Sequence, residues 1–362
     1  MKKTTMMLVG SLLVSTQVAS AESSSESWEQ VISQAKKEGT VTFNVWYLQP
    51  QWRSVVQRFE QQFGIKVRVP EGTMDGNMNK LLAEATKEKG KIDVVALSVD
   101  QLPILQGAKA LAKIDTLPGY KDAFHQIQNV DTQGYAVVFW GNQTGFAYDP
   151  QQMGDKPLPQ TLDQLTQFVG QNPKRFGYND PNNGGAGSAF IQRILTLKGG
   201  GFDSGAKMVS QNVVKNWQKG WEWFSSNEDN ITRTASGADS LTRLNDGELM
   251  LTPAWEDHMK GLQNDGAITK RIKFYVPKFG MPGGGNIAAV AANSPHPAAS
   301  RLFLNWLVQE TTQNELAAVF GSTPMNKNIP TVANTDATDI QFYGKEYGAE
   351  MKKEFVSHVM MK

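Results

Sequence analysis

Aromatic and acidic side chains come directly after two segments that we expect to be strands. Trp46 and Tyr47 follow the first of these segments, and Trp255, Glu256 and Asp257 follow a later one. The face of an aromatic ring attracts a cation, and a neighbouring carboxylate supplies the countercharge. This combination predicts a binding site for an organic cation, with Trp46, Tyr47, Trp255 and Glu256 as its candidate contacts. Packing of the same rings in the core or at its rim is the alternative interpretation.

Polar and aromatic side chains also stand near the ends of other predicted strands. Ser98 and Asp100 follow the third strand, where they could cap the next helix or bind a ligand. Trp140 and Asn142 lie where a strand in the middle of the chain ends. Tyr275, in a strand of the last third, could close a cleft. All five residues are therefore candidate ligand contacts.

A segment rich in glycine and asparagine precedes a predicted apolar helix. Its candidate contacts are Asn183, Gly184, Gly185 and Ser188. Free backbone N–H groups at the start of a helix suit a phosphate, a carboxylate or a similar group. The segment lacks the Gly-Lys-Ser/Thr ending of a Walker loop, and a flexible loop without ligand is the alternative. A second glycine-rich segment, 280–285, predicts a turn.

Nucleophiles and bases of the kind that hydrolytic enzymes use are sparse. The chain has no cysteine and only four histidines, which are widely separated in the sequence. It contains neither the Gly-x-Ser-x-Gly elbow of α/β-hydrolases nor the His-Glu-x-x-His motif of zinc proteases. We therefore expect no catalysis, no metal and no cofactor. Pairs of carboxyl groups could still act as acid and base, so a secreted hydrolase stays an alternative.

The N-terminus has the pattern of a secretory signal peptide. Lys2 and Lys3 precede a short apolar run at 6–14, and small residues follow at 19–21. The apolar run is shorter than the roughly 20 residues that span a bilayer. We expect residues 1–21 to be removed and the mature protein to reside in the periplasm.

The overall charge is close to neutral. The chain has 36 Lys and Arg residues against 35 Asp and Glu residues, a formal net charge of +1. Such a balance provides no basic surface for nucleic acid or an anionic membrane. We therefore expect no nucleic-acid partner.

Apolar residues switch repeatedly between helical and strand spacing. The segment 41–45 alternates as a strand does, and another strand is predicted at 65–69. A helix is predicted from 28, with Ser27 as its cap and Gly39 at its end. Alternation of this kind predicts βαβ units and a mainly parallel sheet. The aromatic stripe of Trp217, Trp221 and Phe224 is expected in the core.

Four parts of the chain carry motifs in a characteristic order. They are 144–150 followed by 159–165, a Gly-Glu turn in 244–250, an Asn-Ser-Pro helix start in 293–299 and a Pro-x-Asn turn in 321–326. In order and spacing, these motifs resemble those of the family 1 extracellular solute-binding proteins of ABC transporters. Within that family, the chain is most similar to the YnjB-like branch, near the thiamine- and polyamine-binding proteins.

The resemblance implies the type II periplasmic binding fold, which is an α/β fold. Two lobes, each a mainly parallel sheet flanked by helices, would be joined by two crossing segments and would enclose a ligand cleft. The implied division is a signal peptide at 1–21, a first lobe at 22–142 plus 279–329, a second lobe at 145–275, and a C-terminal helical tail at 330–362. The crossings are expected near 141–146 and 275–281.

The resemblance also implies a function in solute capture. We expect a monomeric, periplasmic substrate-binding component that delivers a small solute to the permease and ATPase subunits of an ABC importer at the inner membrane. The expected solute is an organic cation such as thiamine or a thiamine-like compound, and a polyamine or another small solute is the near alternative. A chemosensory binding module would use the same cleft and differ only in its partner.

Overall fold

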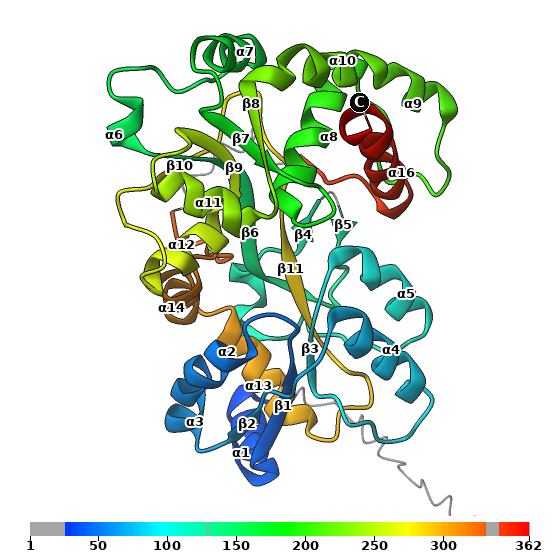
Figure 1. The fold of residues 1–362 in the computed structure, drawn as a ribbon. Helices are drawn as coiled ribbons and strands as arrows, with labels where there is room; N and C mark the ends of the chain where they lie inside the picture. The colour runs from blue at the N-terminus through cyan, green and yellow to red at the C-terminus, as the bar shows by residue number, and fades with distance from the viewer. Residues whose placement is uncertain (1–25, 129, 331–339, 362) are drawn as a thin grey trace, which may run out of the picture.

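The structure is a computed structural model that describes residues 26–128, 130–330 and 340–361. The predicted signal peptide at 1–21 therefore lies outside the described residues. Figure 1 shows two stacked lobes, with the long strands β6 (Val137–Tyr148) and β11 (Gly283–Val290) running between them. Helices alternate with strands in both lobes, so the predicted α/β class is confirmed.

The first lobe, in the lower part of Figure 1, holds the N-terminal third of the chain. Its elements are α1 (Trp28–Glu38), β1 (Thr40–Asn44), α2 (Gln49–Val55), α3 (Gln57–Phe63), β2 (Lys66–Arg68), α4 (Met74–Glu84), β3 (Val94–Leu97), α5 (Leu102–Gly107), β4 (Gln126–Ile127) and β5 (Val130–Asp131). The chain returns to this lobe after β11 and adds α13 (Pro297–Leu307) and α14 (Glu310–Phe320). Residues far apart in sequence thus share one core.

The second lobe, in the upper part of Figure 1, is built from the middle of the chain. Its elements are α6 (Pro150–Met153), α7 (Leu162–Gln171), β7 (Phe176–Asn179), α8 (Gly185–Gly199), α9 (Gln211–Asn216), α10 (Gln218–Asn227), β8 (Ile231–Thr234), α11 (Gly237–Asn245), β9 (Leu251–Trp255), α12 (Glu256–Asn264) and β10 (Lys273–Tyr275). The C-terminal helix α16 (Lys345–Phe355) lies beside α8, α9 and α10 in this lobe.

The described strands form one nine-stranded sheet and a separate β4–β5 pair. The order in the large sheet is β2-β1-β3-β11-β6-β9-β7-β8, and β10 pairs with β6. β1 runs parallel to β2 and β3, and β7 runs parallel to β8 and β9. β6 is antiparallel to both β11 and β9. Each lobe therefore has a parallel group of strands, and antiparallel strands join the two groups.

Strand β6 changes its partner along its length. Up to Gln143 it pairs with β11, and from Thr144 it pairs with β9. β10 also pairs with the second part of β6, so the chain returns to the first lobe between Tyr275 and Gly283. These partner changes support our proposal that the lobes are joined near 141–146 and 275–281.

Local signals in the sequence set the ends of the helices. The Ser27 hydroxyl accepts a hydrogen bond from the Gln30 N–H, and the Gln30 side chain accepts one from the Ser27 N–H. Gly39 ends the same helix with a left-handed φ of 69°. Such reciprocal caps satisfy backbone groups that have no partner inside the helix. The predicted start and end of α1 are therefore confirmed.

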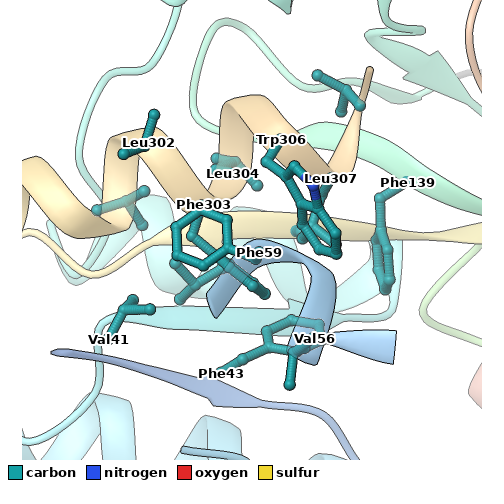
Figure 2. Close-up of a cluster of buried hydrophobic side chains, with 14 of the residues drawn as sticks. Val41, Phe43, Val56, Phe59, Phe139, Leu302, Phe303, Leu304, Trp306 and Leu307 are labelled. Atoms are coloured by element: carbon teal, nitrogen blue, oxygen red, sulfur yellow. The ribbon is translucent and has the colours of Figure 1, made fainter. Parts of the chain in front are cut away.

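The core of the first lobe is rich in aromatic rings. Figure 2 shows Phe43, Phe59 and Phe303 packed between the sheet and the helices. The ring of Phe43 lies 5.1 Å from that of Trp52 and 5.2 Å from that of Phe303. Offset and edge-to-face contacts of this kind add to the free energy gained by burying the rings. The pocket described below is continuous with this core.

The core of the second lobe contains the aromatic stripe predicted from the sequence. Trp217 and Trp221 are each 1% exposed and Phe224 is buried beside them, which confirms the prediction of core packing. Helix α16 adds Tyr347 and Phe355 to the same cluster. The C-terminal segment is thus integrated into the second lobe by apolar burial.

The glycine-rich segment 280–285 differs from its prediction as a turn. Gly283–Gly285 begin strand β11. A Cβ atom on Gly285 would lie 2.4 Å from the carbonyl oxygen of Trp140, and one on Gly284 would lie 2.3 Å from Nε2 of Gln128. Glycine is needed at Gly285 because the backbone carbonyl of Trp140 approaches too closely for a side chain, whereas the atom near Gly284 is the end of a flexible side chain.

Candidate ligand-binding site

A cavity with a volume of about 470 Å³ opens where the two lobes meet. Its walls come from the ends of β1 and β9, from the first turn of α12 and from the crossing strands β6 and β11. The lining residues are Val45, Trp46, Tyr47, Trp52, Met74, Phe139, Trp140, Asn142, Trp255, Asp257, His258 and Asn286. A mainly apolar cavity of this size with a few polar groups suits a small organic molecule.

The first wall of the cavity is an extension of the first lobe's core. Trp46 and Tyr47 follow the last residue of β1, and the chain then turns through Leu48, whose φ of 56° is uncommon outside glycine. Trp140 is only 5% exposed, and its ring lies 6.0 Å from that of Trp52. The ring of Tyr47 meets Trp140 edge to face at 6.4 Å. This wall is therefore held by dense aromatic packing.

The second wall comes from the junction between β9 and α12. Trp255 is the last residue of β9 and is partly exposed, while Asp257 and His258 lie in the first turn of α12. Phe342 stacks on Trp255 with a centroid distance of 5.4 Å and an interplanar angle of 21°. This wall thus presents an aromatic face beside a carboxylate.

One hydrogen bond joins the two walls. The indole Nε1 of Trp140 donates to Oδ2 of Asp257 at 3.3 Å. Burial raises the pKa of Asp257 to about 6, although hydrogen bonds from the His258 N–H and from Trp140 counteract the rise, and the charge of Glu256 adds to it. A carboxylate with so little compensation for its burial favours a cationic partner.

Two further titratable groups face the same space. Burial raises the pKa of Tyr47, and the negative charge of Asp257 raises it further. Burial lowers the pKa of His258. Both side chains are therefore neutral near pH 7, and the charge of the cavity at that pH comes from Asp257.

Five of the predicted contact residues line the cavity. They are Trp46, Tyr47, Trp140, Asn142 and Trp255. They come from β6, β9 and the segment after β1, so the fold brings together strand ends that are more than 200 positions apart in the sequence. This placement supports our proposal that these five side chains contact the ligand.

Glu256 and Tyr275 do not line this cavity. Glu256 pairs instead with Lys260, whose Nζ lies 2.8 Å from Glu256 Oε1 on the outer part of α12. The Tyr275 hydroxyl donates to the Pro159 carbonyl at 3.0 Å, and its ring packs on Phe146 in the second lobe's core. The acidic group at the site is thus Asp257, one position beyond the predicted Glu256.

Ser98 and Asp100 also lie outside the lining of the cavity. The Ser98 N–H donates to Oε1 of Gln101 at 3.2 Å, and the Ser98 hydroxyl donates to Asp100. These bonds belong to the cap of a 3-10 turn at Val99–Gln101. The two residues fit the capping alternative, because their polar groups are used within the turn.

The Gly-Asn loop approaches the cavity at one point. Asn183 is exposed, and the Ser188 hydroxyl donates to the Pro181 carbonyl at 2.9 Å within the loop. Gly184 caps α8. Gly185 lies against Trp255, because a Cβ atom there would be 2.8 Å from the indole Nε1. The loop therefore supports the second wall from behind and does not itself line the cavity.

Several lining residues were missed by sequence reasoning. Asp257 and His258 differ from Glu256 only in their rotation about the start of α12, and a one-residue error in the helix start changes which side chain points inward. Asn286 lies on β11 opposite Trp140, a register that the sequence alone does not give. Met74 and Phe139 are apolar residues without any distinguishing pattern.

The described residues offer neither a metal site nor a membrane-spanning helix. Within the ranges that the structure covers, no three His, Cys, Asp or Glu side chains are grouped so that they could hold a metal ion. In the same ranges, no helix has both the length and the apolar character that crossing a bilayer requires.

Solved structures with the same fold are solute-binding proteins. An extracellular solute-binding protein from Bordetella parapertussis has a TM-score of 0.69 and 15% identity, covering 89% of this chain and 99% of that one. The spermidine/putrescine ABC transporter substrate-binding protein PotD from Streptococcus pneumoniae has a TM-score of 0.68 and 11% identity, covering 89% and 98%. The solute-binding protein RafE, solved with raffinose, has a TM-score of 0.69 and 15% identity, covering 88% and 95%. The two-lobed type II periplasmic binding fold is confirmed.

The family assignment follows from a match over most of the chain. The model of the bacterial extracellular solute-binding proteins matches residues 54–341. The chain therefore belongs to the bacterial extracellular solute-binding protein family, whose members serve ABC transporters as binding proteins. No curated protein sequence is significantly similar to the chain. The YnjB-like branch and the relation to thiamine-binding proteins stay predictions.

Proposed function

We propose that this protein is the periplasmic substrate-binding component of an ABC importer and that its solute is a small organic cation, such as thiamine or a thiamine-like compound. It acts as a monomer and delivers the solute to permease and ATPase subunits. The observation that supports the cation is the buried carboxylate of Asp257 beside the partly exposed indole of Trp255. A cation bound there would gain both a countercharge and an aromatic face.

The charge distribution favours one cationic centre over several. Among the described residues that line the cavity, Asp257 alone is acidic. A polyamine carries ammonium groups at both ends, and each group needs a partner when it is buried. Most of the remaining lining is aromatic or aliphatic, and it suits a ring system such as that of thiamine. A polyamine is therefore the second candidate.

Within the residues that the structure describes, the cluster of Ser294, His296 and Asp93 is not arranged as a catalytic triad. Ser294 is near His296, but its hydroxyl donates to Oδ1 of Asp93 at 2.6 Å, while Nδ1 of His296 contacts Oδ2 of the same carboxylate at 3.0 Å. The serine is thus bonded to the acid and not to the base. Asp93 also accepts the Thr42 N–H at 2.8 Å, which ties this cluster to the structure of the first lobe.

A thermal-shift screen of the mature protein tests the proposal. The compounds are thiamine, its phosphates, choline, spermidine, putrescine and raffinose. A ligand that binds only the folded state at a concentration a hundred times its Kd adds about 2.7 kcal/mol of stability. We expect the largest rise in Tm with thiamine or a compound that shares its cationic ring.

The screen separates the candidates by the compound that responds. A rise with spermidine or putrescine alone would replace the thiamine-like solute by a polyamine. A rise confined to raffinose would contradict the cation while leaving solute capture intact. Growth of a deletion strain on limiting solute separates an importer from a chemosensory module, because only the importer would be needed for uptake.

A further inference from the structure

The C-terminal segment forms a short strap across the place where the lobes meet, which we define as residues 340–343. The carbonyl of Ile340 accepts a hydrogen bond from the N–H of Gly283 at 3.0 Å, at the start of the crossing strand β11. The side chain of Gln341 donates to the carbonyl of Gln128, in the first lobe, at 2.6 Å. The strap is therefore bonded both to a crossing strand and to the first lobe.

A single buried glutamine of the second lobe fixes the backbone on both sides of Phe342. Nε2 of Gln192, on α8, donates to the carbonyl of Gln341 at 3.2 Å. Oε1 of the same amide accepts the N–H of Tyr343 at 3.0 Å. Gln192 is 3% exposed, so these two bonds are shielded from water and well defined. The backbone on both sides of Phe342 is thus held in one position.

The residue after Phe342 secures the strap more firmly. The Tyr343 hydroxyl donates to the Gln192 carbonyl at 3.0 Å, and its ring stacks on Trp217 at 5.6 Å. Beyond it, α16 is buried in the second lobe through Tyr347 and Phe355. The strap therefore has its larger set of contacts in the second lobe, to which Trp255 also belongs.

Phe342 in turn contacts the aromatic face of the cavity. Its ring stacks on Trp255 at 5.4 Å and 21°. Gly185, at the start of α8, lies so close to the edge of the same indole that a Cβ atom would be 2.8 Å from Nε1. Phe342 and Gly185 together restrict the rotation of the indole, while Trp255 still lines the cavity.

We infer that Phe342 is a positioning residue for the ligand site: it holds the indole of Trp255 in the orientation that a cationic solute requires. This inference rests on the proposed function, because it assigns Trp255 to ligand binding. Phe342 itself does not line the cavity, so its effect on affinity acts through Trp255.

A double-mutant cycle tests the coupling between the two rings. The variants are Phe342→Ala, Trp255→Ala and the double variant, titrated with thiamine and, in parallel, with spermidine. We expect Phe342→Ala to weaken binding by about three- to tenfold in the presence of Trp255, and not at all in its absence. Equal losses in both backgrounds would overturn the inference, since they would show that Phe342 acts independently of Trp255.

Two further variants separate positioning from general stability. Phe342→Tyr keeps the stacked ring and should retain the wild-type affinity. Phe355→Leu is the matched control, because Phe355 belongs to the same C-terminal segment and is buried beside Tyr178, away from the cavity. It should lower Tm without changing affinity. An affinity loss in Phe355→Leu as large as in Phe342→Ala would reduce the role of Phe342 to folding.

A measurement without ligand keeps this test apart from the proposed function. Protein labelled with 5-fluorotryptophan gives a 19F resonance for Trp255, which is assigned by its loss in Trp255→Phe. We expect one narrow resonance in the wild type and in Phe342→Tyr, and a broadened or divided one in Phe342→Ala and in Gln192→Leu. An equally narrow single resonance in all four proteins would overturn the inference even if thiamine binds, and broadening would support it even if no compound of the screen binds.

Discussion

The two walls of the cavity differ in what holds them. The first wall is the edge of a dense aromatic core, in which Trp140 contacts the rings of Trp52 and Phe320 at 6.0 and 5.0 Å. The second wall has a partly exposed indole, Trp255, which is supported from behind by Phe342 and Gly185. The hydrogen bond between Trp140 and Asp257 spans the two.

This difference separates stability from recognition. A buried side chain of the first wall, such as Trp140, serves both, because removing it leaves a hole in a packed core. A side chain in the second wall serves mainly recognition, since few core contacts depend on it. Closure of two such lobes around a solute is a hinge motion, in which the second wall would meet a solute that rests on the first.

The largest change in folding free energy is expected for Trp140→Ala. This indole is 5% exposed, and truncating a buried tryptophan costs about 3–5 kcal/mol of folding free energy. Chemical denaturation should show this loss, and binding of the cation should be lost with it. A variant with wild-type stability would contradict the view that the first wall is part of the core.

Asp257→Asn should stabilise the empty protein while weakening binding. The pKa of the Asp257 carboxyl in the folded state is about 6, above its usual value. Between about pH 4 and pH 6, the folded state therefore keeps the carboxyl proton that the unfolded state has already lost. The wild-type stability therefore falls as the pH rises through this window, by about 2–3 kcal/mol. Asn cannot ionise and can still accept the hydrogen bond from Trp140.

The pH dependence of unfolding tests this prediction. We expect the Tm of Asp257→Asn to exceed that of the wild type at pH 7.5 and to approach it at pH 4. Cation affinity of the wild type should fall as the pH drops below about 6, and the variant should show a weak, nearly pH-independent affinity. Glu256→Gln is the matched control, because Glu256 lies beside Asp257 but pairs with Lys260. A similar profile in both variants would assign the effect to the general charge of α12.

Trp255→Ala should lower affinity with little loss of fold. We expect the Kd to rise by more than tenfold, equivalent to at least about 1.4 kcal/mol, and Tm of the empty protein to change far less than in Trp140→Ala. Isothermal titration and a thermal melt measure the two quantities. An unchanged Kd would remove Trp255 from the site, and a large drop in Tm would make the two walls alike.

Two glycine substitutions give the smallest expected effects. Gly185→Ala places a methyl group 2.8 Å from Nε1 of Trp255, so we expect a displaced indole and a two- to threefold weaker affinity, about 0.5 kcal/mol. Gly261→Ala in α12 meets no atom within 4 Å and should stabilise the helix by about 0.5–1 kcal/mol with no change in affinity. Weaker binding in both variants would contradict the specific contact between Gly185 and Trp255.

The fold was largely predictable because its signals are local. The cap at Ser27, the stop at Gly39 and the aromatic stripe around Trp221 all appear in the structure where the sequence predicts them. The glycines at 283–285 were predicted as a turn and form a strand. Their role depends on contacts with Trp140 and Gln128, which are distant in the sequence and leave no local pattern.

The sequence predicts at which strand ends the site lies, but it does not predict which side chains point into the cavity. Trp46 and Tyr47 follow β1 and Trp255 ends β9, and ligands of open α/β sheets lie beyond the carboxyl ends of the strands. The choice between Glu256 and Asp257 depends on the rotation of α12, and the stacking of Phe342 on Trp255 joins positions 87 residues apart. Such contacts are set by tertiary packing alone.

A crystal structure of the protein with the compound that gives the largest rise in Tm would show where the solute lies. We predict that its ring system lies between the first wall at Trp46 and Tyr47 and the indole of Trp255, and that its positive charge faces Asp257. A solute held elsewhere, for example on the loop at Asn183–Ser188 with Asp257 facing empty solvent, would contradict the two-walled cation site.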